Sequence, residues 1–301
     1  MVFGEKVRKI PKPERNWVLG NLPIKEVLTW KNLSTIWNAN NKFDSTIDIV
    51  LKKGYAVIDM MVTMVFRNGS LNPKVATELR GGIALPHLLY GCELWYLTLT
   101  QFSKLEKIQN LFCRKAPSLL PGTSGSEARG LMGLGGIETD ISRIKLYFLG
   151  RIINCSSAQA FKELFVCRLI KWKWRCDAVN RFIPDLIRIL EKYGLMMFKT
   201  DFYTIREFSD EMQWKRIVNE VVQRKEELTW SEKLNQKPVL KLYMQADHYL
   251  NISFWYEIWD FAPINSNIVV DVIRLLCGSF KIDSIRIKNY NCLLSFYCSF
   301  C

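Results

Sequence analysis

The stretch that decides the fold is Leu85-Pro86-His87-Leu88-Leu89-Tyr90-Gly91-Cys92-Glu93-Leu94-Trp95, an apolar segment that leads into a predicted helix ending near Lys115. Thr98 and Gln101 have the spacing of a capping box at the start of that helix. In such a box the hydroxyl accepts a hydrogen bond from the third helical amide, and the Gln side chain reaches back to the cap. Apolar residues at helical spacing then predict one buried face, made of Phe102, Leu105, Ile108 and Phe112, with Gln109 beside them.

The rest of this predicted helix carries positive charge, from Lys104, Lys107, Arg114 and Lys115. A basic face beside a buried one can contact the phosphates of a polyanion. It can equally be the solvated surface of an ordinary helix. The pattern itself is compatible with both interpretations.

The whole chain is basic, with 42 Lys and Arg against 29 Asp and Glu and a formal net charge of +13. The excess is concentrated between Ile141 and Arg181, where nine basic and two acidic residues give a net of +7. Arg143, Lys145 and Arg151 belong to this region. Such a concentration favours RNA or DNA as a partner, because nucleic-acid binding proteins gather Lys and Arg on one surface.

One short motif in that region, Lys171-Trp172-Lys173-Trp174-Arg175, alternates cations with indole rings. Cations can grip phosphates while Trp172 and Trp174 stack on bases. The alternative is the end of a helix, with half-buried Trp side chains and Lys stems lying along the apolar surface.

Cysteine usage and hydropathy point to a reducing compartment, the nucleus or the cytoplasm. The nine Cys are odd in number and have no framework spacing, and residues 1–10 carry no apolar signal segment. We expect buried thiols at Cys113, Cys155, Cys167 and Cys176 and a core position for His87. The longest apolar segments are interrupted by Asp59 and Glu93, so no membrane span is predicted.

The predicted fold is mainly α with a short N-terminal β-hairpin region (α+β), the helices forming a bundle. Strand-like residues flank Gly20-Asn21, a turn signal. Helix starts are predicted at Asp44 or Ser45, at Asn72-Pro73, at Pro184-Asp185 and at Ser209. We divide the chain into residues 1–40, 41–156 and 157–301.

The sequence carries few residue patterns typical of a catalytic site. Polymerases and nucleases hold Mg²⁺ with carboxylates kept close together, and no Asp-Asp pair occurs in the chain. Cys298 and Cys301 form a Cys-x-x-Cys pair. That pair is half of a tetrahedral zinc site, or a chance spacing. Zinc binding is expected only if another residue completes the site.

Several segments together resemble one family. Tyr90-Gly91-Cys92-Glu93-x-Trp95 and Phe148-Leu149-Gly150-Arg151 carry the resemblance, and Lys192-Tyr193-Gly194-Leu195 supports it. Their order and spacing are similar to the region after the catalytic palm in reverse transcriptases of non-LTR (LINE-type) retrotransposons. The resemblance implies that residues 1–40 are a remnant of palm strands, 41–156 a thumb-like helical region, and 157–301 a C-terminal extension ending in half of a zinc finger.

The chain also departs from that family. The Ala-Asp-Asp metal motif, which holds Mg²⁺ in the parent polymerase, would precede Met1. The turn that holds the primer in the family reads Asn32-Leu33-Ser34 here. The resemblance therefore implies a catalytically incomplete chain with no cofactor of its own.

We expect no polymerase activity from this chain alone. We expect nucleic-acid backbone contacts from its cations, namely Lys104, Lys107, Arg114, Lys115, Arg143, Lys145 and Arg151, with Trp172 and Trp174 as stacking residues. The alternative function is a helical protein-interaction module in which the basic residues only confer solubility.

Overall fold

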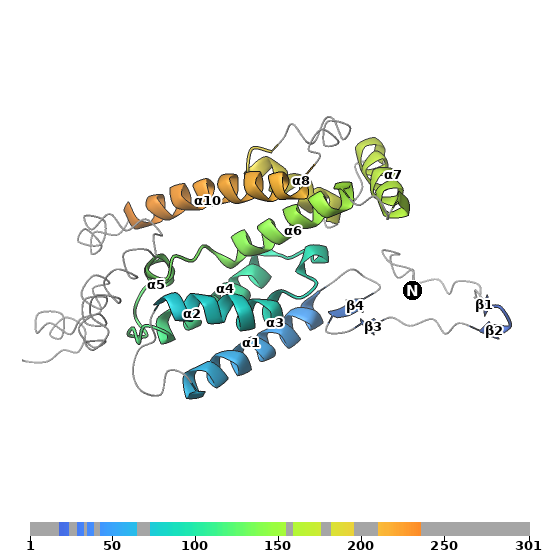
Figure 1. Cartoon of the computed structure of the whole chain (residues 1–301). Coiled ribbons are helices and arrows are strands. Elements are labelled where there is room, and N and C mark those ends of the chain that lie inside the picture. Colours follow the sequence, from blue (N-terminus) through green and yellow to red (C-terminus); the bar gives the residue numbers. More distant parts are fainter. Residues whose placement is uncertain are drawn as a thin grey trace, which may run out of the picture. The chain divides into compact units, whose positions relative to one another are not determined.

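The computed structural model describes residues 18–23, 29–32, 35–38, 43–64, 73–154, 159–175, 182–195 and 210–235. These residues are mostly helical, with short antiparallel strands near the N-terminus, which confirms the predicted fold class. Figure 1 shows the elements in chain order, from the blue strands to the orange helix α10. No helix in these ranges combines the length and the apolar content needed to cross a bilayer.

Two hairpins begin the described chain. Strand β1 (Val18–Leu19) pairs with β2 (Leu22–Pro23) across Gly20-Asn21, so the predicted turn is confirmed. Gly20 has a φ of +61°, a conformation that two-residue hairpin loops need and that glycine adopts without strain. Strand β3 (Thr29–Asn32) pairs with β4 (Thr35–Asn38), and Asn32 faces Thr35 in the register.

The helices begin where local signals place them in most cases. They are α1 (Asp44–Met64), α2 (Pro73–Leu79), the π-helical turn η1 (Arg80–Ala84), α3 (Leu85–Leu89), the 3-10 turn η2 (Cys92–Leu94), α4 (Leu99–Lys115), α5 (Gly125–Leu131), α6 (Ile137–Asn154), α7 (Gln159–Arg175), α8 (Phe182–Lys192) and α10 (Glu211–Asn235).

Two predicted helix starts differ from those in the structure, the start of α8 by three residues and the cap of α10 by one. Helix α8 begins at Phe182, so Pro184 lies inside its first turn rather than before it. Proline is tolerated there because the first amides of a helix have no intrahelical acceptor. The cap of α10 is Asp210, whose Oδ1 accepts a hydrogen bond from the Met212 amide at 2.9 Å. Ser209, the predicted cap, lies outside the described residues.

The apolar stretch at residues 85–95 is two short turns separated by a left-handed residue. Helix α3 ends at Leu89, Gly91 has a φ of +76°, and η2 follows. The capping box of α4 is confirmed, because the Thr98 amide donates to Gln101 Oε1 at 2.9 Å and the Gln101 amide donates to Thr98 Oγ1 at 3.3 Å.

His87 is exposed rather than in the core, which corrects the prediction for this residue. Its Nδ1 lies 2.8 Å from the carbonyl oxygen of Ile83, one turn earlier. The imidazole is therefore hydrogen-bonded to the backbone of its own helical segment while its side chain stays exposed to solvent.

The contacts divide the chain into two compact units. The first comprises Met1–Ala56, Ile83–Glu106 and Ile137–Lys225, and the second Val57–Gly82, Lys107–Gly136 and Glu226–Cys301. Both predicted domain boundaries, near residues 40 and 156, fall outside the described residues. The three-part division therefore stays a prediction.

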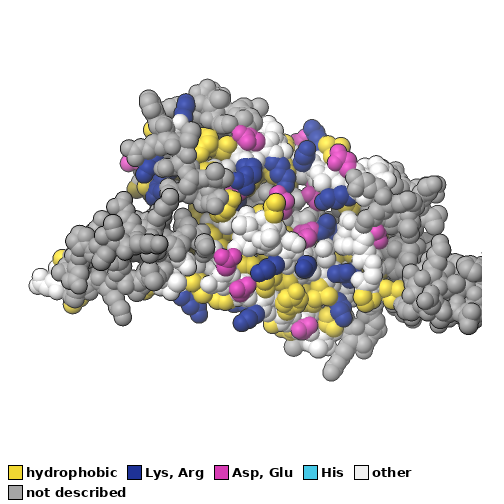
Figure 2. Space-filling model, turned by 180° about the vertical axis from the view of Figure 1, so that it is seen from behind, with side chains coloured by type: hydrophobic (Ala, Val, Ile, Leu, Met, Phe, Trp, Pro, Cys, Tyr) yellow, Lys and Arg dark blue, Asp and Glu magenta, His cyan; other side chains and the backbone are white. Residues whose placement is uncertain are grey.

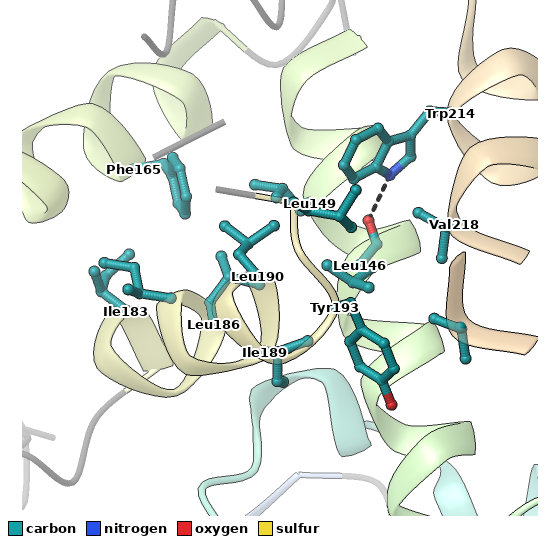
Figure 3. Packing of buried hydrophobic residues seen from close by; sticks show 13 residues of the cluster. Leu146, Leu149, Phe165, Ile183, Leu186, Ile189, Leu190, Tyr193, Trp214 and Val218 are labelled. Atoms are coloured by element: carbon teal, nitrogen blue, oxygen red, sulfur yellow. Dashed lines mark hydrogen bonds between the residues drawn. The ribbon is translucent and has the colours of Figure 1, made fainter. Parts of the chain in front are cut away.

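The core of the first unit is an apolar cluster built from α6, α7, α8 and α10. Leu146 and Leu149 come from α6, Phe165 from α7, Leu190 from α8 and Trp214 from α10. Figure 3 shows the Trp214 indole lying against α6, with its Nε1 donating a 2.7 Å hydrogen bond to the Leu146 carbonyl oxygen. This bond satisfies the one polar atom of a side chain that is 1% exposed.

Gly150 permits that close approach of α10 to α6. A Cβ at this position would lie 2.2 Å from Trp214 Cδ1 and 2.6 Å from Trp214 Nε1. We expect Gly150→Ala to lower the free energy of unfolding by about 1–3 kcal/mol, because overpacking forces the indole or the helix to shift. Urea unfolding monitored by circular dichroism measures the change.

A matched control for this substitution is Gly82→Ala in η1, where an added Cβ would meet nothing within 4 Å. We expect this variant to be as stable as the wild type or more stable, by up to about 1 kcal/mol, since Ala has the higher helix propensity. Equal stability of the two Ala variants would refute the packing role of Gly150.

The second unit has its own buried tryptophan, Trp230 of α10. Its Nε1 donates to the carbonyl oxygen of Ser126 in α5 at 3.1 Å, and it covers Gly130, where a Cβ would lie 2.4 Å from Trp230 Cζ2. Polar bonds support this packing, since Arg80 donates to Gln109 Oε1 and Arg129 to Asn110 Oδ1, each at 3.0 Å.

Candidate nucleic-acid interface

Three lysines of α4 are exposed as predicted. Lys104, Lys107 and Lys115 point to solvent, whereas Leu105, Ile108 and Phe112 of the same helix are buried. Lys104 Nζ lies 3.9 Å from Asp48 Oδ1, with both side chains more than half exposed. An ion pair of that kind contributes little to stability, so the Lys104 ammonium remains accessible to another anion.

Arg114, at the end of α4, is bound to the backbone of the loop that follows. Its Nη1 donates to the carbonyl oxygens of Pro121 at 3.0 Å and Thr123 at 3.4 Å, and its Nε donates to Asn110 at 3.2 Å. The guanidinium therefore caps carbonyl groups of this segment. These contacts give Arg114 a structural role in holding the loop after α4.

Lys145 is buried, which corrects its predicted role as a phosphate contact. Its side chain in α6 is 1% exposed, and its Nζ donates to Asp185 Oδ2 and to the carbonyl oxygen of Trp95. Asp185 also lies 3.6 Å from the guanidinium of the exposed Arg188. The ammonium is therefore already paired with a carboxylate and almost fully buried, which does not suit a surface contact with phosphate.

The other two predicted cations of α6 differ in accessibility. Arg143 is one-third exposed, and its Nη1 lies 3.5 Å from Asp140 Oδ1, one turn earlier. Arg151 is exposed, and its guanidinium carbon lies 5.8 Å from the centroid of the Phe148 ring. Arg151 is therefore the α6 cation that an external anion can reach most easily.

Trp172, a predicted stacking residue, is half-buried and packs against the core cluster. Lys171 and Lys173 on either side of it are exposed. This arrangement matches the alternative interpretation of the motif, in which the indole is anchored and the lysines reach solvent. The side chain of Trp174 lies outside the described residues.

Two buried groups of the described residues, the Cys92 thiol and the Arg129 guanidinium, have shifted pKa values. Burial, and next the neighbouring Glu93, raise the pKa of the Cys92 thiol well above its usual range, so the thiol stays protonated at neutral pH. Burial lowers the pKa of Arg129, and Glu226 opposes that effect. Cys113 is buried as predicted, whereas Cys167 is exposed on α7 and that prediction is wrong. Cys155 and Cys176 lie outside the described residues.

The predicted zinc half-site is not tested, because Cys298 and Cys301 lie outside the described residues. Within the described ranges, no group of three or more His, Cys, Asp and Glu side chains is placed to hold a metal ion.

Figure 2 shows one face, on which Lys and Arg side chains (dark blue) are scattered among hydrophobic (yellow) and acidic (magenta) ones. Sequence reasoning missed two features of the structure. One is Asp185 as the partner of Lys145, and the other is the exposed apolar flank of α7 beside Arg168. The low polarity of Phe161 to Ile170 was a signal for the second.

Comparison with known proteins finds no matching family model, no matching curated protein and no matching solved structure.

Proposed function

We propose that this chain binds the phosphate backbone of a nucleic acid through the exposed lysines of α4. The observation that supports the proposal is the division of α4 into two faces. Leu105, Ile108 and Phe112 are buried, while Lys104, Lys107 and Lys115 are exposed. We name the three exposed lysines the α4 basic face.

The geometry of one helix sets the spacing of these ammonium groups. Lys104, Lys107 and Lys115 stand at positions i, i+3 and i+11, which fall within about 80° of one another around the axis at 3.6 residues per turn. From Lys104 to Lys115 the axis rises about 16 Å at 1.5 Å per residue. That length spans several phosphates, since each strand of a duplex carries one charge per roughly 3.4 Å of axis.

Backbone contacts position a nucleic acid without reading its sequence. We therefore propose an RNA or DNA duplex as the partner, without base specificity. The likeness to non-LTR reverse transcriptases adds to this proposal, because in that family the helices after the palm hold the template–primer duplex through its backbone. On this proposal the chain retains duplex holding and lacks the carboxylates for polymerisation.

Removing two charges from the α4 basic face tests the binding directly. We expect Lys107→Gln combined with Lys115→Gln to weaken filter binding of a primer–template duplex by about tenfold or more near 0.1 M salt, because two phosphate contacts and their counterion release are lost. The matched control is Lys52→Gln with Lys53→Gln on α1, which removes the same charge from two other exposed lysines.

The control variant should bind within about twofold of wild type, apart from the smaller effect of net charge. Equal losses in the two double variants would mean that net charge alone, and not the α4 basic face, drives binding. Circular dichroism of all variants confirms that exposed Lys→Gln changes leave the helices intact.

Absence of polymerisation is the second part of the proposal. We expect no primer extension by the purified chain with Mg²⁺ or Mn²⁺ and all four nucleotides, since two-metal transfer needs clustered carboxylates. Metal-dependent primer extension that copurifies with the chain, and that is lost when the chain is removed from the sample, would contradict the expected absence of polymerisation.

A further inference from the structure

An apolar groove runs between α6, α7 and α8 in the first unit. It has a volume of about 400 Å³. Its walls are almost entirely hydrophobic, with many aromatic rings, and include Phe148, Phe161, Leu164, Phe165, Trp172 and Phe182. We call this feature the α7 groove.

One flank of α7 forms a whole wall of this groove. Residues 161, 164, 165, 168, 171 and 172 line it, at positions i, i+3, i+4, i+7, i+10 and i+11. The flank is about 16 Å long at 1.5 Å per residue, or three turns of helix. Phe161 is 68% exposed and Leu164 57% exposed, although both are large apolar side chains. Exposed apolar clusters of this kind mark interaction sites.

Positive charge borders the same flank. Arg168 and Lys171 line the groove, and Arg151 lies over the Phe148 ring that forms part of its opposite wall. Glu163 is the sole acidic residue of α7, and it does not line the groove. A complementary partner is therefore apolar where it enters the groove and acidic where it meets these cations.

We propose that the α7 groove binds an amphipathic helix of a partner protein, with its apolar side in the groove and acidic residues facing Arg168 and Lys171. Grooves of this length take helices that insert side chains at i, i+3 or i+4 and i+7. A nucleic acid fits less well, because the walls offer aromatic and aliphatic groups and only two cations. Pairing with α7 of a second copy also fits less well, since that helix would bring five more Lys and Arg to the same place.

The probe is a fluorescein-labelled 18-residue helical peptide with Leu and Phe on one side and Glu on the other, measured by anisotropy against the full chain. A second peptide has Lys in place of every Glu. We expect the wild-type chain to bind the acidic peptide at least tenfold more tightly than the basic one. Binding of both peptides with equal affinity, or of neither, refutes the proposal.

Two variants locate the binding. Leu164→Glu places a charge in the groove wall and is expected to weaken binding of the acidic peptide at least tenfold. Leu228→Glu is the matched control, since Leu228 is also 57% exposed but belongs to α10, and it should bind as wild type does. Arg168→Glu should lose affinity for the acidic peptide and gain affinity for the basic one. If Arg168→Glu does not shift the preference from the acidic to the basic peptide, the cations do not face the peptide.

Nucleic acid remains an outcome of the test. If a duplex displaces the acidic peptide, and Leu164→Glu also weakens duplex binding, the groove is a nucleic-acid site and the proposal is wrong. The α4 variant Lys107→Gln with Lys115→Gln should bind the peptide normally. Peptide binding and duplex binding by this variant therefore test the two proposals separately, so that the groove proposal can fail while backbone binding holds, or the reverse.

Discussion

Replacing Asp185 with alanine is expected to lower the free energy of unfolding by about 3–5 kcal/mol, because the Lys145 ammonium is then buried without its counter-ion. The Lys145 side chain is 1% exposed, and Asp185 is the carboxylate bound to it. The carbonyl oxygen of Trp95 remains as an acceptor, but one neutral oxygen does not offset the loss of solvation of a full charge.

Two further variants separate the ion pair from its surroundings. Lys145→Met combined with Asp185→Leu removes both charges, and we expect it to recover most of the lost stability, as uncharged replacements of buried ion pairs do. Arg188→Ala should cost less than about 1 kcal/mol, because the Arg188 side chain is half exposed and 3.6 Å from Asp185. Urea unfolding of the four proteins gives the values. A loss below 1 kcal/mol in Asp185→Ala would contradict a buried, charged pair.

The second large effect is expected for Trp214→Ala, which should destabilise the first unit by about 3–5 kcal/mol. Trp214 fills the space between α6 and α10 at the side of Gly150, next to Val218 and Leu149 in the core cluster. Its removal leaves a cavity and also takes away the donor to the Leu146 carbonyl oxygen. Both losses act on the same two helices.

Trp214→Phe separates these two contributions. It keeps most of the apolar volume and loses the Nε1 donor, so we expect a cost of about 1–2 kcal/mol. Met212→Ala, at a residue that is 70% exposed on the same helix, should lie within about 0.5 kcal/mol of wild type. Circular dichroism is the suitable readout, because the substitutions alter the tryptophan fluorescence. Equal values for Ala and Phe at position 214 would refute the cavity argument.

Local chemistry made part of the fold predictable. The capping box of Thr98 and Gln101 depends on hydrogen bonds between residues close in sequence. Helix α1 begins at Asp44 and α2 at Pro73, where an acidic residue in the first turn and the fixed φ of proline favour a helix start. The two faces of α4 follow from 3.6-residue periodicity. The exposure of Lys104, Lys107 and Lys115 was therefore predictable from the same pattern.

Contacts between residues far apart in sequence were not predictable in this way. Lys145 was expected at the surface because a charged side chain is usually solvated. It is buried because it pairs with Asp185, which lies 40 positions later in the sequence. Arg114 was likewise expected to be available, but it binds carbonyl groups of a loop. Spacing along one helix does not show which cations will meet a distant carboxylate or carbonyl group.

The resemblance placed a turn at Asn32-Leu33-Ser34, but the residue pattern did not predict the pairing of β3 with β4, for a related reason. The two strands flank Leu33-Ser34, a pair that carries no strong turn signal, and the strands are held by Trp30 opposite Trp37 and their neighbours in the register. Thr46 of α1 also holds strand β4. The Ile36 amide donates a hydrogen bond to Thr46 Oγ1 at 3.0 Å, and the Thr46 hydroxyl donates one to the Ile36 carbonyl oxygen at 2.9 Å. The β3–β4 hairpin is therefore stabilised by pairing between its strands and by contact with α1, neither of which a turn signal predicts.

Backbone binding by the α4 basic face is tested most directly by the salt dependence of duplex affinity. We predict that the logarithm of the association constant falls linearly with the logarithm of salt concentration, with a slope of about −0.9 per phosphate contacted. The Lys107→Gln and Lys115→Gln double variant should show a slope shallower by about 2. A flat salt response of the wild-type chain, or the same slope in the variant, would contradict the proposed function.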